Sequence, residues 1–177
     1  HMSYDDLHCE KPVRKSKLIS CVQSNKGITA GHQLRKNFLR VFTHRNASVL
    51  DLYGSISFAN KHLKDNDKNN ALEPYKYCLA FDNQDTIGNF FGTQFTDSLL
   101  RWCVPIYWGG ANLDDYFPKK SFLQIDITSS TCYEEVLDLI ENDDYDERLE
   151  AVKEARQLIL NKYNMWPILQ KAVDSNK

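Results

Sequence analysis

Residues 89–126 restrict the possible folds of this chain more than any other segment. Their sequence, NFFGTQFTDSLLRWCVPIYWGGANLDDYFPKKSFLQID, predicts an amphipathic helix, a short buried strand, a glycine break, a one-turn helix and a second strand. The buried strand ends at Gly109 and Gly110, and glycines in such a place let a ligand approach the backbone closely. Because ligands of open parallel sheets bind where strands meet loops, the segment predicts a binding edge in an α/β domain. A helix–strand unit that binds nothing has the same local pattern.

The composition is that of one globular domain. A chain of 177 residues can bury a core of its own, and 42% hydrophobic with 26% charged residues is ordinary globular composition. The formal net charge of -2 predicts no nucleic-acid partner. The basic run at 11–17 is typical of a solvated stretch that leads into a strand.

The sequence also bears on where the protein works. No apolar stretch approaches the roughly 20 residues of a membrane helix, and no signal peptide is recognisable in the polar N-terminus. The five cysteines are odd in number and lack CxxC spacing, which favours a reducing compartment. We therefore expect a cytoplasmic protein without a membrane segment.

Strands alternate with helices along the chain, which is typical of a parallel sheet covered by helices on both faces. Apolar runs predict strands at 18–22, 48–54, 77–81, 104–108 and 122–127. The run at 77–81 is apolar throughout and is therefore expected to be central. Helical spacing of apolar residues predicts helices at 33–44, 95–102, 131–141, 145–163 and 165–173. Residues 55–70 are expected to be irregular with one short helix at most.

Two parts of unequal size follow from this organisation. Residues 1–16 are expected to form a polar N-terminal arm that begins with a tag remnant, His1-Met2. Residues 17–177 are expected to form one Rossmann-like domain.

Polar residues suited to a phosphorylated or sugar ligand follow three of the predicted strands. They are Ser24, Asn25 and then Arg35 after the first strand, Asp82, Asn83 and Gln84 after the third, and Gly109, Gly110 and Asn112 after the fourth. In a doubly wound sheet these positions gather at one edge. An arginine fork and the N–H groups of a helix N-terminus both bind phosphate oxygens.

Each of these residues also has an interpretation without a ligand. Asn and Ser are common in turns because they hydrogen-bond their own backbone, and Arg35 alone is compatible with a solvated helix residue. We interpret His32 as a helix cap or core contact rather than a base. Asp97 lies in an apolar helix, where contact with a ligand or backbone and plain exposure are equally compatible with the pattern.

Several kinds of catalytic site are not indicated. The histidines show no HxH or HExxH spacing, and the chain contains no Walker loop and no GxGxxG. No Ser/His/Asp or Cys/His nucleophile arrangement is recognisable. The sequence therefore predicts neither a metal site nor a resident cofactor.

Three motifs occur in the same order as in a known family. They are LISCVQSNKGITAGHQLRKNF at 18–38, YKYCLAFDN at 75–83, and the segment 95–126 with its VPIYWG and Pro-x-x-Ser-Phe. Through them the chain resembles the C-terminal, nucleotide-sugar-binding domain of family 10 glycosyltransferases, the α-1,3/1,4-fucosyltransferases. The resemblance implies one of the two Rossmann-like halves of a GT-B glycosyltransferase. It also implies inverting transfer of L-fucose from GDP-fucose to an N-acetylglucosamine-type glycan acceptor, without a divalent metal obligatory for donor binding.

The resemblance implies roles for particular residues. Asn25 and Arg35 correspond to residues that meet the donor diphosphate, and Asn83 to one that contacts the nucleotide. Phe90 takes the place of a tyrosine beside the ribose or base. The remaining positions expected at the site through matching motifs are Lys76, Thr93, Gln94, Asp97 and Gly109.

Two departures from the family bear on activity. The family's Tyr-x-Thr-Glu-Lys signature carries Thr93 here in place of Glu and Gln94 in place of Lys, and a neutral amide binds phosphate less strongly than a charged group. We expect weak donor binding, a different donor, or none. In addition, the family's acceptor-binding N-terminal half, which supplies the carboxylate taken to be the general base, is missing from this sequence.

These points lead to one expected function and two alternatives. The first is the GDP-fucose-binding domain of a fucosyltransferase-like enzyme, inactive alone and reaching its glycan acceptor through the missing N-terminal domain. The alternatives are a non-catalytic module that kept the fold, and a transferase for another nucleotide sugar.

Overall fold

Five parallel strands form one sheet in the order β2-β1-β3-β4-β5. The computed structural model describes residues 3–46, 48–84 and 88–175, and this topology belongs to them. The strands are β1 (Lys17–Val22), β2 (Leu50–Tyr53), β3 (Tyr75–Phe81), β4 (Val104–Trp108) and β5 (Leu123–Gln124). The predicted central position of β3 is confirmed. The strand order reverses between β1 and β3, which makes their carboxyl ends the topological switch point of the sheet.

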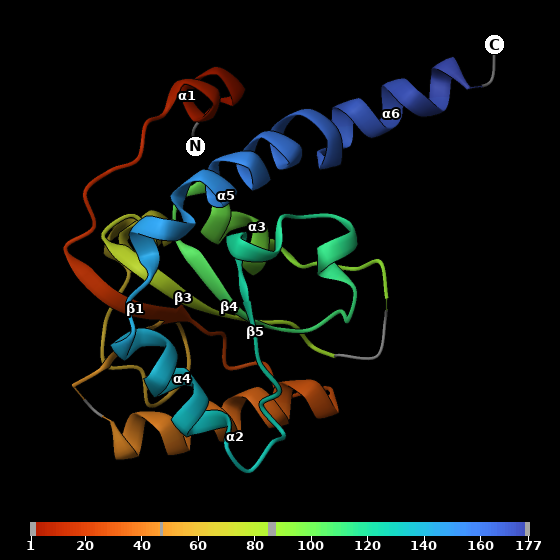
Figure 1. Cartoon of the computed structure of the whole chain (residues 1–177). Coiled ribbons are helices and arrows are strands. Elements are labelled where there is room, and N and C mark those ends of the chain that lie inside the picture. Colours follow the sequence, from red (N-terminus) through yellow and green to blue (C-terminus); the bar gives the residue numbers. More distant parts are fainter. Residues whose placement is uncertain (1–2, 47, 85–87, 176–177) are drawn as a thin grey trace.

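Helices cover both faces of this sheet (Figure 1). The helices α2 (Ala30–Arg45) and α4 (Cys132–Glu141) lie on one face, where the rings of Phe38 and Tyr133 stack with centroids 5.0 Å apart. On the other face lie α3 (Thr93–Leu100) and α5 (Tyr145–Leu158). The expected α/β class, a parallel sheet between two helical layers, is therefore confirmed.

The hydrophobic core explains why the sequence of the central strand, β3, is apolar throughout. Leu79 of β3 is fully buried, as are Phe38 of α2 and Phe95 of α3 on the two faces. Phe38 meets Phe81 edge to face, with ring centroids 5.2 Å apart. Burying one such side chain stabilises a fold by roughly 1.5–3 kcal/mol, so the pattern of large apolar residues positions both helical layers.

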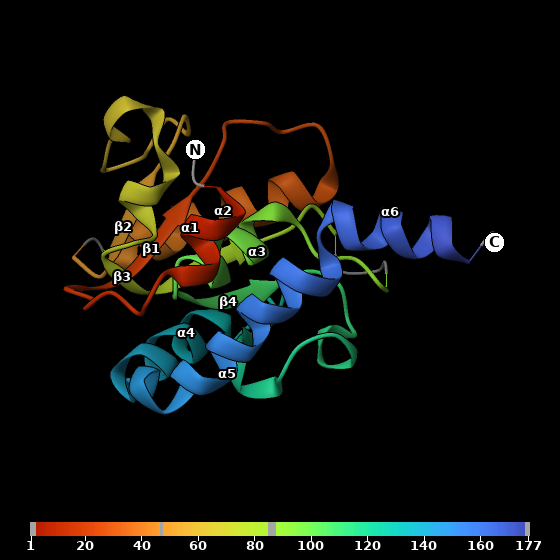
Figure 2. The ribbon, with the colours of Figure 1, turned by 90° about the horizontal axis from the view of Figure 1, so that it is seen from above.

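Helix boundaries differ from the predicted ones for local reasons. The helix α2 begins at Ala30, three residues before the predicted start, because Thr29 and His32 form a capping box at its N-terminus. The helix α5 continues into a π-helical turn at Ile159–Tyr163. After it, α6 (Met165–Asp174) projects from the body of the protein in both ribbon views (Figures 1 and 2) and buries no residue.

Two predictions about the strands and the irregular segment were wrong in extent. The strand β5 has two residues instead of the predicted six. Ile125 and Ile127 are buried beyond its end, so burial without strand pairing produced the apolar pattern. Between β2 and β3, the expected single short helix is replaced by two 3-10 turns, at Lys64–Asn66 and Lys68–Ala71.

The N-terminal segment is held against the domain. It contains the short helix α1 (Tyr4–Cys9), with Ser3 and Asp6 forming a capping box. Further on, the Glu10 carboxylate lies 2.9 Å from Arg101 and 3.2 Å from Arg156. His1 and Met2, the expected tag remnant, lie outside the described residues. Among the helices that the structure describes, none has the length and apolar character needed to cross a bilayer.

Candidate functional site

The candidate site is the region between the loops that follow β1 and β3, called the crevice here because ligands of open α/β sheets bind at this point. Asn25 lies in the loop that follows β1, and Asn83 lies in the loop that follows β3. The N-terminus of α2 closes against the second loop at Gly31, where an added Cβ would lie 1.6 Å from the Asn83 carbonyl oxygen. Only glycine permits this approach. The polar residues predicted at the ends of β1 and β3 therefore lie at the same edge of the sheet.

Arg35 is buried against the end of β3 rather than exposed to solvent. Its side chain is buried, with 6% exposed, and its Nη1 donates to the Phe81 carbonyl at 3.1 Å. Its Nε is buried without a hydrogen-bond partner among the described residues. Burial lowers the pKa of the guanidinium, and the nearby Asp82 carboxylate opposes that shift. A buried cation with an unused N–H at a strand end is suited to an anionic ligand.

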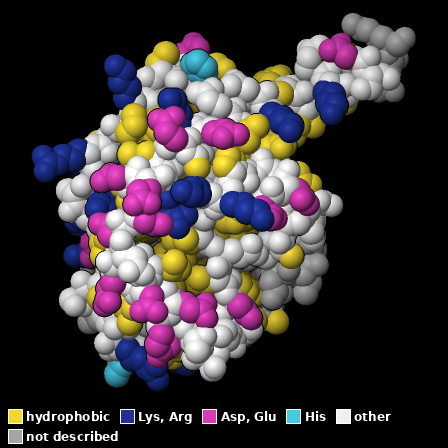
Figure 3. All heavy atoms as spheres, in the orientation of Figure 1, with side chains coloured by type: hydrophobic (Ala, Val, Ile, Leu, Met, Phe, Trp, Pro, Cys, Tyr) yellow, Lys and Arg dark blue, Asp and Glu magenta, His cyan; other side chains and the backbone are white. Residues whose placement is uncertain are grey.

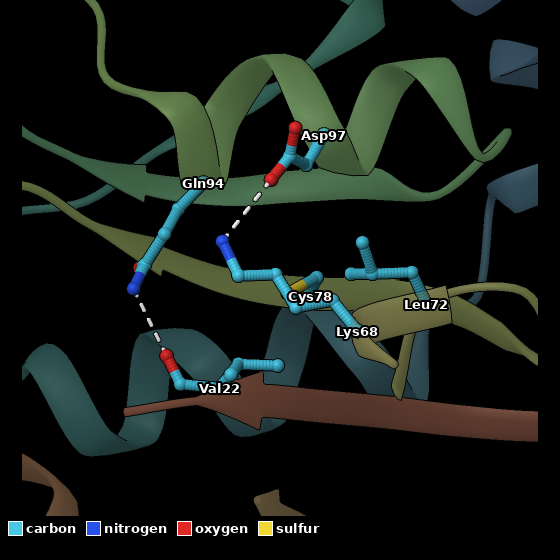
Figure 4. Close-up of a pocket in the computed structure, with 6 residues that line it drawn as sticks. All are labelled: Val22, Lys68, Leu72, Cys78, Gln94 and Asp97. Carbon is cyan, nitrogen blue, oxygen red and sulfur yellow. Dashed lines mark hydrogen bonds and ion pairs between the residues drawn. The ribbon is translucent and has the colours of Figure 1, made fainter. Parts of the chain in front are cut away.

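Gln94 ties β1 to β3 at the switch point (Figure 4). Its Nε2 donates to the Val22 carbonyl at 2.9 Å, and its Oε1 accepts from the Phe81 amide at 3.3 Å. Both ends of the amide are therefore committed to the backbone. Thr93 beside it is exposed. The first turn of α3 carries no acidic residue, but the Gly92 amide donates to Asp82 and the Phe95 amide to the Gly92 carbonyl. The backbone N–H groups of Thr93 and Gln94 are the ones left for an anion among the described residues.

A buried carboxylate organises the loops around the crevice. The Oδ2 of Asp82 accepts from the Tyr107 hydroxyl at 2.5 Å and from the Gly92 amide at 3.0 Å. The Tyr107 oxygen in turn accepts from the Gly110 amide at 2.9 Å. Burial raises the pKa of Asp82, while these hydrogen bonds and Arg35 work in the opposite direction. This network holds the start of α3 and the end of β4 together.

Glycines make the network possible at the end of β4. An added Cβ at Gly109 would lie 2.1 Å from the Tyr107 hydroxyl oxygen, and one at Gly92 would lie 2.0 Å from Asp82 Oδ1. Gly109 is thus at the predicted edge, where it makes room for a side chain of the protein itself. Asp82 is one of the predicted strand-end residues, and no local pattern indicates its role. Its pairing with Tyr107 depends on the β3–β4 register, which no local pattern shows.

Phe90 lies on a loop that is held in place by hydrogen bonds of Asn89 with Asn112 and Tyr116. The Asn89 amide donates to Asn112 Oδ1 at 2.8 Å, and the Tyr116 hydroxyl donates to Asn89 Oδ1 at 2.6 Å. The Phe90 side chain remains 43% exposed. An exposed ring on a fixed loop is available for stacking on a planar ligand group.

Two of the predicted site residues are not in the crevice. Lys76 lies at the amino end of β3, about 20 Å along the strand from Asn83, where it pairs with Asp143. Asp97 lies on α3, and its Oδ2 is 3.4 Å from the Lys68 ammonium.

The Lys68–Asp97 pair borders a cavity of about 20 Å³, which also touches Gln94 and Cys78 (Figure 4). A space of this size holds about one water molecule. Asp97 is therefore partly exposed and forms an ion pair with Lys68.

His32 acts as a helix cap, as predicted. Its Nδ1 lies 2.5 Å from the Thr29 hydroxyl oxygen, and its backbone amide donates to the same oxygen at 3.3 Å. Within residues 3–46, 48–84 and 88–175, no group of three or more His, Cys, Asp or Glu side chains is placed to hold a metal ion.

Comparison with known proteins gives one family match. The model for the C-terminal region of glycosyltransferase family 10 (fucosyltransferase) matches residues 12–150. A search of curated proteins found no significant relative.

Solved structures share the fold. An α1,3-fucosyltransferase with GDP-fucose aligns with a TM-score of 0.60 at 21% identity, over 81% of this chain and 40% of its own. TarM of S. aureus, in a complex that contains UDP, aligns with a TM-score of 0.60 at 15% identity, over 95% and 37%. The C-terminal domain of the glycosyltransferase LpcC from Francisella tularensis aligns with a TM-score of 0.53 at 12% identity, over 93% and 95%.

These likenesses define the fold and its extent. The chain spans about two fifths of the length of the fucosyltransferase structures, 39% and 40% in two of them. Its α/β domain has the architecture of one half of a GT-B glycosyltransferase, as predicted.

Proposed function

This chain belongs to glycosyltransferase family 10, the fucosyltransferases, and from that we propose that it is the domain that binds the nucleotide-sugar donor. The proposed ligand is GDP-fucose, in the crevice between the carboxyl ends of β1 and β3. One observation carries the proposal: Arg35 is buried at this switch point with an unpartnered Nε. Burying a charge is costly unless the charge is paired, and a diphosphate would supply the missing partner.

The other residues of the crevice have matching roles in this proposal. Asn25 contacts the diphosphate, Asn83 the nucleotide, and the exposed ring of Phe90 stacks beside the base or ribose. Thr93 and the open N–H groups at the start of α3 face the sugar side. In transfer with inversion, Arg35 would stabilise the charge that grows on the leaving diphosphate, so its contact would strengthen in the transition state.

Calorimetric titration with GDP, GDP-fucose and guanosine tests this proposal. We expect GDP and GDP-fucose to bind with a Kd on the order of 0.1–1 mM, and guanosine to bind more weakly because it lacks the phosphates. Arg35→Gln should weaken GDP binding about tenfold or more, since hydrogen bonds to charged groups contribute about 1.5–3 kcal/mol. No heat with either GDP or GDP-fucose would refute donor binding by this chain.

Arg40→Gln is the matched control, because Arg40 is an exposed arginine of the same helix that bonds only to Asn37 among the described residues. It should bind GDP like the unaltered protein. Thermal unfolding of both variants distinguishes lost binding from lost folding. Equal GDP affinity of Arg35→Gln and Arg40→Gln would remove Arg35 from the site.

A different donor, or a module that binds without catalysis, is a second candidate. The observation that favours it is the state of Gln94, whose amide is committed to the Val22 and Phe81 backbone instead of replacing the family's lysine at the phosphates. Titration with UDP and ADP beside GDP separates the two candidates. Preference for UDP would point to another nucleotide sugar, and equal weak binding of all three to a degenerate site.

We further propose that this chain binds the donor without transferring the sugar. The carboxylate at the crevice, Asp82, is already engaged by Tyr107 and Gly92, and the glycan acceptor would bind to a part of the protein outside this sequence. We also propose that the protein works in a reducing compartment such as the cytoplasm, a proposal that the odd number of cysteines without CxxC spacing supports.

A further inference from the structure

The cations beside the crevice are distributed unequally between its two sides. On the α2 side, Lys26, Arg35 and Lys36 have no carboxylate oxygen within 4.0 Å among the described residues, whose ion pairs involve other cations. Near α3, Lys68 of the 3-10 turn before β3 is already paired with Asp97 of α3 at 3.4 Å. Positive charge without a partner therefore lies on the α2 side.

Lys36 is held at the mouth of the crevice by the loop after β1. Its ammonium group donates to Asn25 Oδ1 at 3.2 Å and to the Asn25 carbonyl at 3.4 Å, at an exposed position. The backbone amide of Asn25 donates to Ser55 Oγ at 3.1 Å, so the segment after β2 also holds the loop after β1. An ammonium group has three donors, so one remains for a ligand that reaches Asn25.

Two further observations indicate that this side is prepared for an anion. Arg35 is 6% exposed, and its Nε has no partner among the described residues. The positive charges of these cations also act on His32 in the first turn of α2. There burial lowers the pKa of His32 first, and Arg35, Lys26 and Lys36 lower it further.

The opposite side offers little charge. Thr93 is neutral, and the Gln94 amide is committed to the Val22 carbonyl and the Phe81 amide. A diphosphate carries two or more negative charges, which Arg35 alone does not balance. The remaining charge must come from groups that are not already paired.

We propose that Lys36 neutralises the donor diphosphate in place of the family lysine that Gln94 has replaced, with Lys26 adding to the field. Lys36 also orients Asn25 toward the ligand through its two hydrogen bonds. The proposal rests on the proposed donor function. It assigns the positive charge that meets the phosphates to Lys36 of α2 instead of to position 94 of α3. Charge at this position compensates for the loss at Gln94 without any change in the fold.

Calorimetry with GDP, inorganic pyrophosphate and guanosine tests it on the full chain. Lys36→Gln should weaken GDP and pyrophosphate about three- to tenfold, leave guanosine unchanged, and reduce the salt dependence of GDP binding. Lys36→Arg keeps the charge and should restore most of the affinity. Lys68→Gln is the matched control on the other side of the crevice and should bind GDP like the unaltered protein. Thermal unfolding checks that each variant is folded.

The possible outcomes separate this inference from the donor function. If the unaltered protein binds GDP and Lys36→Gln binds it equally well, the role of Lys36 is wrong and the donor function stands. If pyrophosphate binds through Lys36 but GDP does not bind, the anion site stands and the donor function fails. Weakening by Lys68→Gln without weakening by Lys36→Gln would assign the charge to Lys68 and overturn the inference. Binding of neither GDP nor pyrophosphate would overturn both.

Discussion

The amide of Gln94 holds the ends of β1 and β3 together at the point where a ligand would enter. Its two hydrogen bonds use a donor and an acceptor in one side chain, a combination that lysine lacks. Gln94, which we propose takes the place of a charged residue of the family, is thus part of the scaffold. The same substitution removes a charge and adds a link between strands.

This residue leads to a prediction with two opposed effects. Gln94→Lys together with Thr93→Glu should tighten GDP binding, because the pair restores the family's charged groups. It should also lower the free energy of unfolding by about 1–3 kcal/mol, since the Phe81 amide loses its acceptor in a partly buried place. Calorimetry and urea unfolding measure the two effects.

Thr93→Glu alone is the control, because Thr93 is exposed and its substitution should change stability little. If the double variant binds GDP no better than the unaltered chain, the motif alignment through Thr93 and Gln94 is wrong. An unchanged free energy of unfolding would instead show that the Gln94 bridge contributes nothing.

Asp82 gives a prediction about pH. Burial raises its pKa in the folded protein above the ordinary value of 3.8, so the folded state holds the proton more tightly than the unfolded state does. The stability from this group is therefore complete below about pH 4 and is lost as the pH rises through the folded pKa. Relative to the unaltered protein, Asp82→Asn should become progressively more stable across that window.

Urea unfolding of the two proteins at a series of pH values measures this difference, and the subtraction cancels the other carboxylates. Tyr107→Phe sharpens the test. It removes a hydrogen bond that lowers the pKa of Asp82 in the folded protein. The folded pKa of Asp82 should therefore be higher in this variant, and the loss of stability with rising pH should extend to higher pH. A stability difference between Asp82→Asn and the unaltered protein that does not vary with pH would contradict the assignment.

At the scale of elements, the N-terminal segment contacts α5 through the Glu10 carboxylate and through the Leu7 carbonyl, which accepts from Arg156 at 2.7 Å. Glu10 lies between Arg101, which follows α3, and Arg156 of α5. The Arg156 guanidinium also lies over the Trp102 ring, 4.4 Å from its centroid. Both arginines are buried, so their charge is tolerated only while Glu10 is present.

Glu10→Gln should therefore lower the free energy of unfolding by about 3 kcal/mol, as when one partner of a buried ion pair is removed. Urea unfolding measures the change. Glu150→Gln is the matched control, because its pair with Lys153 is exposed and such pairs contribute about 0–1 kcal/mol. Equal losses in the free energy of unfolding for the two substitutions would show that Glu10 does not hold the N-terminal segment in place.

The elements differ in how well local pattern predicted them. Helix α4 and strand β4 lie where apolar spacing placed them, because each buries a regular set of side chains against the sheet. The start of α2 was missed by three residues because Thr29 and His32 form a cap that apolar spacing does not show. Strand β5 was overestimated because Ile125 and Ile127 reach the core from irregular backbone.

At the scale of the whole molecule, one sheet with its switch point between β1 and β3 gathers residues from distant parts of the chain. Arg35, Asn83 and Gln94 come from three separate segments and meet at one crevice. In contrast, α6 stands out from the rest of the surface with hydrophobic side chains along it (Figure 3). Those that the structure leaves exposed are Met165, Trp166, Ile168, Leu169 and Val173.

The sequence by itself determined the α/β class, the central place of β3 and the family. These follow from local apolar spacing and from motifs in a fixed order, which are properties of neighbouring residues. Only the tertiary structure decided that Lys76 lies at the far end of its strand, that Asp82 pairs with Tyr107, and that Gln94 bridges two strands. Each of these depends on strand register and on contacts between segments far apart in the chain, where hydrogen bonds and buried charges find partners that no local pattern encodes.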